Sequence, residues 1–306
     1  MTEIGWSYRI TDLGGSQMSA NQVQTTANAD QARYWNTEPG RKWIVYEKCL
    51  NTVFQSINER LLEHAVPTTG ERVLDIGCGT GATTRDIASR IGRNGLVVGV
   101  DISSLLLERA EAHQANAELD HIRYLLADAQ THDFDPEYFD LMVSLFGVMF
   151  FADPIAAFKN LFGALRAGGR LSFVGWAPIS GNPWFEIPRD AAVARLGKPS
   201  PPSPRAPGPL AFANIDYVLG ILEEAGFSNC SGEVETVNLF YPGAVEEPAY
   251  LASDIGPSAV IMREYNGTAE DLAAIQRDTT RGFQQFAVEG GVSIPAILNF
   301  FDAVKR

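Results

Sequence analysis

Cysteine is scarce in this sequence, and its placement excludes several classes of protein. Three cysteines, Cys49, Cys78 and Cys230, are spread over 306 residues, an odd number with no paired spacing. A disulfide framework and a cysteine-rich metal site are therefore not expected. The histidines also lack metal-ligand spacing, so we expect no metal. This pattern is typical of a reduced, cytoplasmic protein.

Positive charge and long apolar runs are also in short supply. The chain has 24 basic and 37 acidic side chains, a net charge of −13. Such a balance is a poor match for nucleic acid or an acidic membrane surface. No run is long enough to span a bilayer, and residues 1–28 show no period, so we expect them to form a loose tail.

Strands and helices alternate along the middle of the chain. An apolar run at 72–76 predicts a strand, and helical spacing at 82–91 predicts the helix that follows it. Three further strands are expected near 96–100, at 122–128 and within 139–151, where the loop that leaves the strand is included, and a fifth is expected at 170–177. Helices are expected at 104–116 and at 154–168, the second with Asp153 as its N-cap. Such alternation predicts a parallel sheet that is covered by helices on both faces.

The flanks of this core have different patterns. Apolar residues from Trp43 to Leu61 recur at helical spacing and predict one amphipathic helix, within an N-terminal helical cover at 29–66. We place the core at 67–177 and a proline-rich insertion or lid at 178–213. Residues 214–306 then complete the sheet, with a helix at 215–227, a strand near 233–241, a polar helix near 269–287 and a last strand near 295–304.

The stretch "DIGCGTG", residues 75–81, places three glycines on the turn between the first strand and its helix. Glycines tolerate positive φ and remove the Cβ atoms that would hold a ligand away from the backbone N–H groups. Ligands of parallel sheets bind at the carboxyl ends of the strands. We therefore expect a ligand to lie against this turn.

Three acids lie at the carboxyl ends of consecutive predicted strands, and they converge on the same edge of the sheet. They are Asp75, Asp101 and Asp128. Asp101 lies at the interval of about 20 residues past the glycines at which nucleotide sites place an acid on the ribose hydroxyls. Asp128 is suited to accept from an exocyclic amine. Each acid alone is equally well explained as a helix cap or turn residue, but all three together favour a ligand site.

Four stretches together resemble the class I S-adenosylmethionine-dependent methyltransferases, in particular the small-molecule group that includes the ubiquinone and menaquinone methyltransferases. They are "VLDIGCGTG", "VVGVDIS", "LADAQ" and "FDLMVSLFGVMFF…ALRAGGRLSFV". The resemblance spans 72–176 and implies a Rossmann-like, doubly wound, mostly parallel seven-stranded sheet.

The resemblance also implies roles for individual residues. The segment 75–81, with Asp75, Gly77, Cys78, Gly79 and Gly81, would line the methionine part of S-adenosylmethionine. Asp101 would hold the ribose, Ile102 would pack on the adenine, and Asp128 with Ala129 would read the adenine edge.

The turn departs from the pattern of a dinucleotide site. It lacks the third-glycine spacing that lets a helix N-terminus meet a pyrophosphate. S-adenosylmethionine has no phosphate but carries an amino group, which suits an acid such as Asp75. An NAD-linked oxidoreductase is thus a weaker alternative, and a catalytically inactive cofactor-binding partner subunit is another. Cys78 has no evident base partner and is expected to be structural.

Aromatic residues and sulfur gather near the strand ends and their covers. We expect Phe146 beside the cofactor, Trp35 and Trp43 to cover cofactor or substrate, and an acceptor wall made of Phe146, Met149, Trp176, Trp184 and Phe185. Core packing is the competing explanation for each of them. This wall predicts a small, partly apolar or aromatic acceptor. Alignment and desolvation can drive methyl transfer without a general base, for which His132 is the one candidate. A monomer or homodimer is expected.

Overall fold

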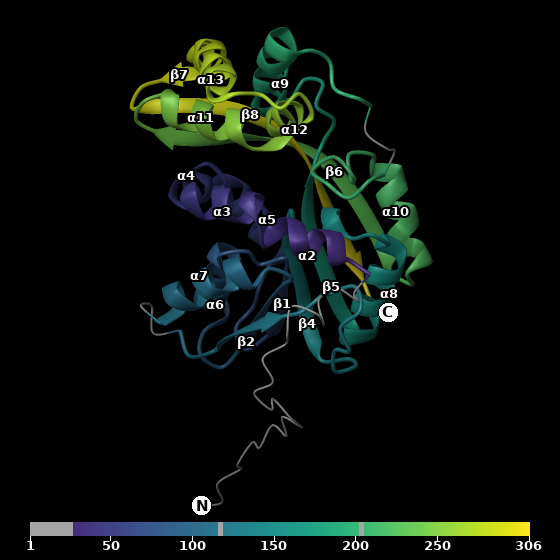
Figure 1. Ribbon diagram of the computed structural model, residues 1–306. Coiled ribbons are helices and arrows are strands. Elements are labelled where there is room, and N and C mark those ends of the chain that lie inside the picture. The colour runs from purple at the N-terminus through teal and green to yellow at the C-terminus, as the bar shows by residue number, and fades with distance from the viewer. Residues whose placement is uncertain (1–26, 116–118, 202–204) are drawn as a thin grey trace, which may run out of the picture.

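The computed structural model describes residues 27–115, 119–201 and 205–306, so most of the expected tail lies outside the described residues. Its centre is a twisted sheet, with helices on both sides and a group of helices at one end (Figure 1). The strands are β1 (Arg72–Ile76), β2 (Leu96–Asp101), β3 (Ile122–Leu126), β4 (Phe139–Leu145), β5 (Leu165–Trp176), β6 (Ser228–Pro242), the two-residue β7 (Ala287–Val288) and β8 (Gly291–Val304).

The strand order confirms the predicted mostly parallel, seven-stranded sheet. The order is β3-β2-β1-β4-β5-β8-β6, and β7 pairs with β8 beside this path. The first five strands are parallel, whereas β8 is inserted antiparallel between β5 and β6. Because β1 lies centrally between β2 and β4, the loops that leave these strands meet at one edge.

Helices follow the strands as the alternation predicts. They are α6 (Ala82–Ile91), α7 (Ser104–Ala115), α8 (Pro154–Ala164) and α10 (Ile215–Glu224), with the 3₁₀ turn η1 (Gly147–Phe150) after β4. Asp153 caps α8 by accepting from the backbone N–H of Ala156 at 3.0 Å. The helix ends at Ala164 rather than near Gly168, because β5 already begins at Leu165, which pairs with Phe139 ahead of a register shift.

The N-terminal cover is a chain of short helices and not the single helix predicted from 43 to 61. It comprises α2 (Ala29–Trp35), α3 (Glu38–Val45), α4 (Glu47–Val53) and α5 (Gln55–Ala65). The breaks fall at Tyr46 and Phe54, where ψ rises to 6° and 0° and the chain changes direction. These turns let the cover wrap the sheet edge: α3 contacts α7, while α5 contacts β4, β5 and β6.

A helical lobe, α9 (Pro183–Leu196), α11 (Glu246–Asp254), α12 (Gly256–Glu264) and α13 (Ala269–Phe283), packs at one end of the sheet. Sequence periodicity did not indicate α9, α11 or α12. The short 3₁₀ turn η2 (Gln284–Phe286) leads from α13 into β7. Residues 291–297 of β8 extend past β5 into this lobe and pair there with β6.

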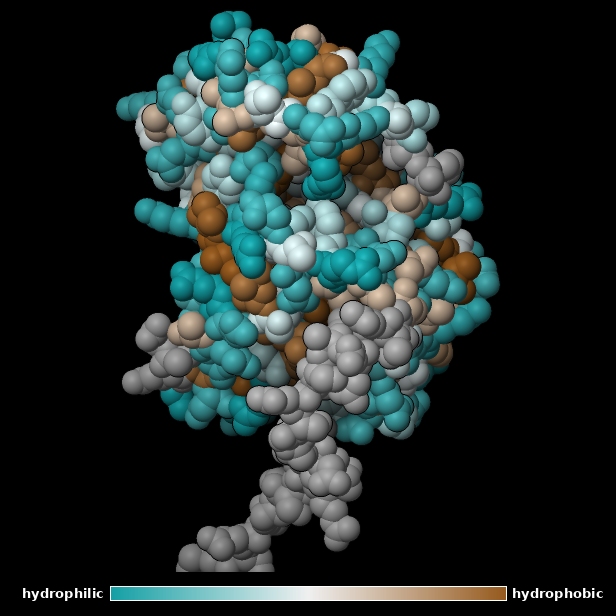
Figure 2. All heavy atoms as spheres, in the orientation of Figure 1, coloured by the Kyte–Doolittle hydropathy of each residue, from teal (hydrophilic) through white to brown (hydrophobic). Residues whose placement is uncertain are grey.

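The lobe has a small core of its own and joins the main core through aromatic rings. The small core contains Ala192, Ile261 and Ile275. Trp184 of α9 stacks on Phe283 with ring centroids 6.0 Å apart and meets Phe54 at 6.2 Å. Most of the surface in Figure 2 is hydrophilic, in keeping with the net charge, and hydrophobic side chains appear there in several separate groups.

Candidate active site

The glycine turn after β1 uses its three glycines in different ways. All have positive φ: 68° at Gly77, 56° at Gly79 and 77° at Gly81. A Cβ on Gly77 would lie 2.6 Å from the Cα of Gly147, and one on Gly81 would collide with the Tyr124 hydroxyl. A Cβ on Gly79 would meet nothing nearer than the Trp43 indole nitrogen at 4.0 Å. Gly77 and Gly81 therefore permit close packing, and Gly79 leaves open space above the turn.

Asp75 is a buried carboxylate with unused hydrogen-bonding capacity. It is 1% exposed, and its Oδ2 accepts from the Thr84 hydroxyl at 2.6 Å. No donor among the described residues reaches its Oδ1. Burial, with a further contribution from the charge of Asp101, raises the pKa of Asp75 to about 7. A cation or a hydrogen-bond donor beside Oδ1 would satisfy this atom.

Asp101 fixes the turn to the next strand. Its Oδ2 accepts from the Gly79 N–H and its Oδ1 from the Ser103 N–H, both at 2.8 Å. Burial raises the pKa of Asp101, although these N–H groups oppose the shift. Each oxygen keeps lone-pair capacity toward the cavity, and Ile102 follows directly in its lining.

Asp128, after β3, is held by a residue that the sequence had placed in the loose tail. Asn28 is 4% exposed, and its Nδ2 donates to Asp128 Oδ1 at 2.8 Å. The Gln130 N–H donates to the same oxygen at 3.0 Å, while Oδ2 receives the Asn28 N–H at 3.3 Å. The expected tail therefore ends before Asn28, because this residue is part of the buried structure.

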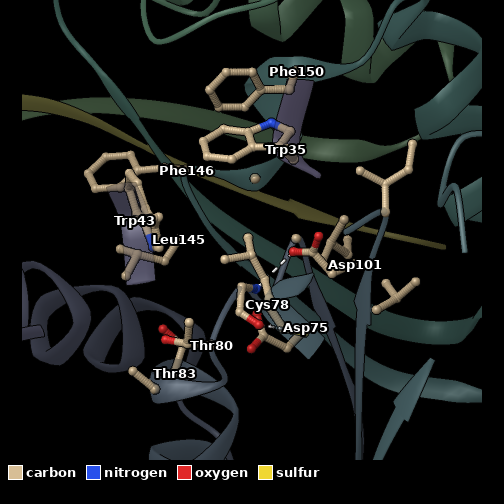
Figure 3. A pocket seen from close by; sticks show the side chains of 18 of the residues that line it. Trp35, Trp43, Asp75, Cys78, Thr80, Thr83, Asp101, Leu145, Phe146 and Phe150 are labelled. Atoms are coloured by element: carbon tan, nitrogen blue, oxygen red, sulfur yellow. Dashed lines mark hydrogen bonds between the residues drawn. The ribbon is translucent and has the colours of Figure 1, made fainter. Parts of the chain in front are cut away.

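These loops form the floor of a cavity of about 390 Å³, and helices α2–α5 form its roof. We use "floor" for the cavity-lining residues at the carboxyl ends of β1, β2, β3 and β4 and in the segments that follow them, and "roof" for the lining residues from 28 to 58. Figure 3 shows the rings of Trp35, Trp43, Phe146 and Phe150 across the cavity from Asp75, Cys78 and Asp101. The expected site residues that line the cavity are Asp75, Gly77, Cys78, Gly79, Asp101, Ile102, Asp128, Ala129, Phe146, Trp35 and Trp43.

Several expected site residues lie outside this lining. Gly81 is used in packing, as described above. Trp176 stacks behind Phe146 at 4.9 Å with an interplanar angle of 8°, and Phe185 packs on Trp176 at 4.4 Å. Met149 and Trp184 are buried in the core, 2% and 1% exposed. The structure thus brings Phe146 to the cavity and puts the other expected wall residues behind it, because the large apolar rings pack into the core.

His132 also stands away from the cavity lining. Its ring packs edge-on against Phe134 at 4.6 Å. Burial lowers its pKa, with the charge of Asp133 acting in the opposite direction. Its backbone N–H donates to the Asp128 carbonyl at 2.9 Å, so His132 meets the floor through its main chain.

Cys78 lines the floor but is poorly suited to act as a nucleophile. It is 8% exposed, and burial together with Asp101 and Asp75 raises the pKa of its thiol well above the ordinary value. A neutral thiol is a weak nucleophile. The sulfur fills the space beside Gly99, where an added Cβ would lie 3.0 Å from it.

Sequence analysis missed most of the roof and part of the floor. The additional lining residues include Asn28, Gln31, Leu50, Asn51, Phe54, Gln55, Asn58, Thr83, Arg85, Asp86 and Phe150. A periodic apolar face on residues 43–61 was visible in the sequence, but it did not show which residues would face a ligand. Phe54 has ring contacts with both Phe146, at 5.5 Å, and Trp184.

The cavity lining carries an excess of negative charge. Besides the Cys78 thiol, its ionisable side chains are four carboxyl groups, Asp75, Asp86, Asp101 and Asp128, and one guanidinium, Arg85, which donates to the Thr80 carbonyl at 2.9 Å. Within the described ranges, no group of three or more His, Cys, Asp or Glu side chains is arranged to hold a metal ion. The helices of the same residues include none that is long and apolar enough to cross a membrane.

Comparison with known proteins identifies the core. Residues 73–169 match the methyltransferase domain family. Aklanonic acid methyltransferase of Streptomyces sp. (strain C5) is 35% identical over 128 residues, which cover 42% of this chain and 58% of that protein. A ubiquinone/menaquinone biosynthesis C-methyltransferase of Proteus mirabilis is 33% identical over 54% of this chain and 64% of its own length. The chain contains a class I S-adenosylmethionine-dependent methyltransferase domain.

The fold that this chain shares with solved structures covers more residues than the family match at 73–169. Geranyl diphosphate C-methyltransferase of Streptomyces coelicolor aligns with a TM-score of 0.51 at 16% identity, covering 92% of this chain and 99% of that one. The YcgJ protein of Bacillus subtilis also aligns with a TM-score of 0.51, at 16% identity over 81% and 97% of the two chains. Matches to the first three curated relatives span about half of those proteins, 58%, 48% and 41% of their lengths.

Proposed function

We propose that the whole protein binds S-adenosylmethionine in this cavity and transfers its methyl group to a small, partly apolar or aromatic acceptor. The observation that carries this proposal is the unpaired Oδ1 of Asp75, a buried acceptor in the cavity lining. The neighbouring strands β2 and β3 also place an acid in this lining, Asp101 and Asp128. The ammonium group of the cofactor would supply the missing donor.

The three acids fit three polar parts of the cofactor, in the order in which these parts follow one another along the molecule. Asp75 is suited to the ammonium, Asp101 to the ribose hydroxyls, and Asp128 to the exocyclic amine of the base. Gly79 leaves the space in which the ligand can approach the backbone. Arg85 is the cation among the lining residues and is suited to the carboxylate end.

S-adenosylmethionine would supply a methyl group on its sulfonium: an acceptor lone pair or carbanion bonds to the methyl carbon in line with the S–CH₃ bond, which breaks and leaves S-adenosylhomocysteine. The contribution of the chain is to align the acceptor and exclude water, which can lower a barrier by about 7–11 kcal/mol. Trp35, Trp43, Phe54 and Phe146 give apolar and π surfaces for both tasks. No general base is part of the proposal.

The cavity charge narrows the acceptor class. Because the lining has four carboxylates and one guanidinium, it would repel an anionic acceptor molecule. An uncharged or cationic acceptor molecule fits this charge better. The names of two relatives refer to aklanonic acid and to ubiquinone or menaquinone biosynthesis, which supports a small-molecule acceptor. The free cysteines support our further proposal of a cytoplasmic protein, which we expect to be a monomer or homodimer.

A methyl-transfer assay tests this function. The purified protein is incubated with methyl-labelled S-adenosylmethionine and a panel of phenols, quinones, amines and thiols, with carboxylic acids, diphosphates and RNA as comparison acceptors. We expect label in at least one uncharged ring compound or amine. Exclusive labelling of RNA or diphosphates would contradict the acceptor class, and binding of NADH in place of the cofactor would favour the oxidoreductase alternative.

A further inference from the structure

Residues 28–36 form a strap across the edge of the sheet. The strap consists of Asn28, helix α2 and Asn36, and Gln31 and Trp35 lie on the side that lines the cavity. At its far end, the Trp35 carbonyl accepts from the Ser103 hydroxyl at 2.9 Å. Asn36 Oδ1 accepts from the Ser104 hydroxyl at 3.1 Å. This end is thus fixed to the loop that also positions Asp101.

Asn28 fixes the near end to two other loops. Its Nδ2 donates to Asp128 Oδ1 at 2.8 Å and to Gln130 Oε1 at 3.1 Å. Its Oδ1 accepts from the Ala152 N–H at 2.7 Å. One side chain therefore connects the strap, the loop after β3 and the loop after η1.

The position of Asn28 makes this arrangement informative. It is the N-cap residue of α2, where an Asn side chain normally accepts from the N–H groups of its own helix. Asn28 makes no such cap bond. The side chain instead spans to Asp128, so the helix gives up a stabilising cap. Local helix stability does not explain this choice.

We propose that Asn28 is a positioning residue and the latch of a strap that closes the base end of the cofactor cavity. This inference rests on the proposed cofactor function. Asn28 Nδ2 and the Gln130 N–H both donate to Asp128 Oδ1, which leaves Oδ2, with one long contact of 3.3 Å, able to accept from a ligand amine. The latch orients the carboxylate, and the cofactor or its product enters and leaves when the latch opens.

The kinetics of S-adenosylhomocysteine binding to the full chain test the latch. Hydrogen bonds to a charged partner are worth about 1.5–3 kcal/mol, so we expect Asn28→Ala to speed product release by roughly tenfold or more. Association should also become faster, because an open strap no longer limits entry. A residue with a merely structural role would lower the melting temperature and leave both rate constants unchanged.

Asn160→Ala is the matched control. Asn160 Nδ2 donates to the carbonyls of Ala129 and His132, in the same loop as Asp128, but Asn160 neither belongs to the strap nor lines the cavity. We expect its two rate constants to stay within about twofold of the wild type, well below the effect of one charged hydrogen bond. Equal acceleration in both variants would show that loop rigidity, and not the latch, controls exchange.

Hydrogen exchange of the wild type provides a second measurement that needs no variant. Ligand binding should increase protection of residues 28–36, while α10 should be unaffected. Unchanged protection of the strap, or unchanged kinetics in Asn28→Ala, would overturn the latch alone. Absence of any S-adenosylhomocysteine binding to the wild type would instead overturn the proposed function.

Discussion

The floor and the roof of the cavity are built from different kinds of structure. The floor consists of loops that leave adjacent parallel strands, and it offers backbone groups and buried carboxylates. The roof consists of short helices whose side chains reach the cavity from a separate part of the chain, and it offers rings and amides such as Phe54 and Asn51. Both surround the same space but depend on different interactions.

This difference assigns the two parts different tasks. Floor groups are fixed by strand pairing, so they suit a ligand that every member of a family shares. Roof groups depend on packing between helices and on bonds such as that of Lys42 Nζ to Asp254 Oδ1 at 2.6 Å, which ties α3 to the helical lobe. We therefore expect floor variants to affect the cofactor and roof variants to affect the acceptor and the exchange rates.

The largest effect should come from filling the floor. Gly77→Val would place side-chain atoms against Gly147 backbone at a positive φ, which combines overpacking with backbone strain. We expect a loss of about 2–5 kcal/mol in the free energy of unfolding, measured by chemical denaturation, and no cofactor binding. Gly70→Ala is the control, since Gly70 also has positive φ but its added Cβ meets nothing within 4 Å. Equal losses in both variants would show that strain, and not close packing, is responsible.

A second effect concerns the charge of Asp75. Because its folded pKa is raised from 3.8 to about 7, its contribution to the stability of the unliganded protein is full below pH 3.8 and is lost as pH rises to 7. Pairing with an ammonium favours the ionised form. Affinity for S-adenosylhomocysteine should therefore rise with pH, by up to about tenfold per unit below pH 7.

The Asp75→Asn variant provides the comparison for this pH effect. An amide cannot ionise, so we expect weaker binding whose dependence on pH between 5.5 and 8 is much flatter, as measured by calorimetry at each pH. An equally steep profile in the variant would show that another group titrates. A flat profile in the wild type would contradict the pairing of Asp75 with the ammonium.

A smaller effect is expected at the roof. Phe54→Leu keeps an apolar side chain but loses ring contacts, each worth about 0.5–1.5 kcal/mol. We expect kcat/KM for the acceptor to fall by roughly threefold to tenfold, with cofactor affinity nearly unchanged. Trp184→Phe is the matched control because Trp184 also touches Phe54 but lies outside the cavity lining. The Trp184→Phe variant should be less stable than the wild type but should methylate the same acceptors. A change in the acceptors that it methylates would show that Trp184 contributes to the acceptor site.

The floor was predictable because its signals are local. Strand β1 and helix α6 have the predicted bounds, 72–76 and 82–91, since an apolar run, a glycine turn and a stop glycine specify them in one stretch. The acids at 75, 101 and 128 followed from the same alternation. Their partners did not: Asn28 reaches Asp128 across 100 residues, a contact without any local signal.

The roof and the helical lobe were less predictable for a physical reason. Trp176 at the end of β5 and Trp184 in the segment that follows were expected at the cavity. Stacking on Phe146 and Phe283 buries their rings instead. Helix α9 begins at Pro183 and contains Pro188, and α12 begins with Gly256 and a proline. Because proline and glycine have low helix propensity, the sequence did not indicate either helix. Tertiary packing stabilises these elements against weak local propensity.

Calorimetric titration of S-adenosylhomocysteine into the wild type and into Asp101→Ala tests the central claim most directly, because Asp101 joins the glycine turn to the proposed ribose site through its bond from Gly79. We expect S-adenosylhomocysteine to bind the wild type, to bind the variant roughly tenfold or more weakly, and NADH to bind neither protein. Equal affinity of the two proteins for S-adenosylhomocysteine, or binding of NADH in its place, would contradict the assignment of the floor to this cofactor.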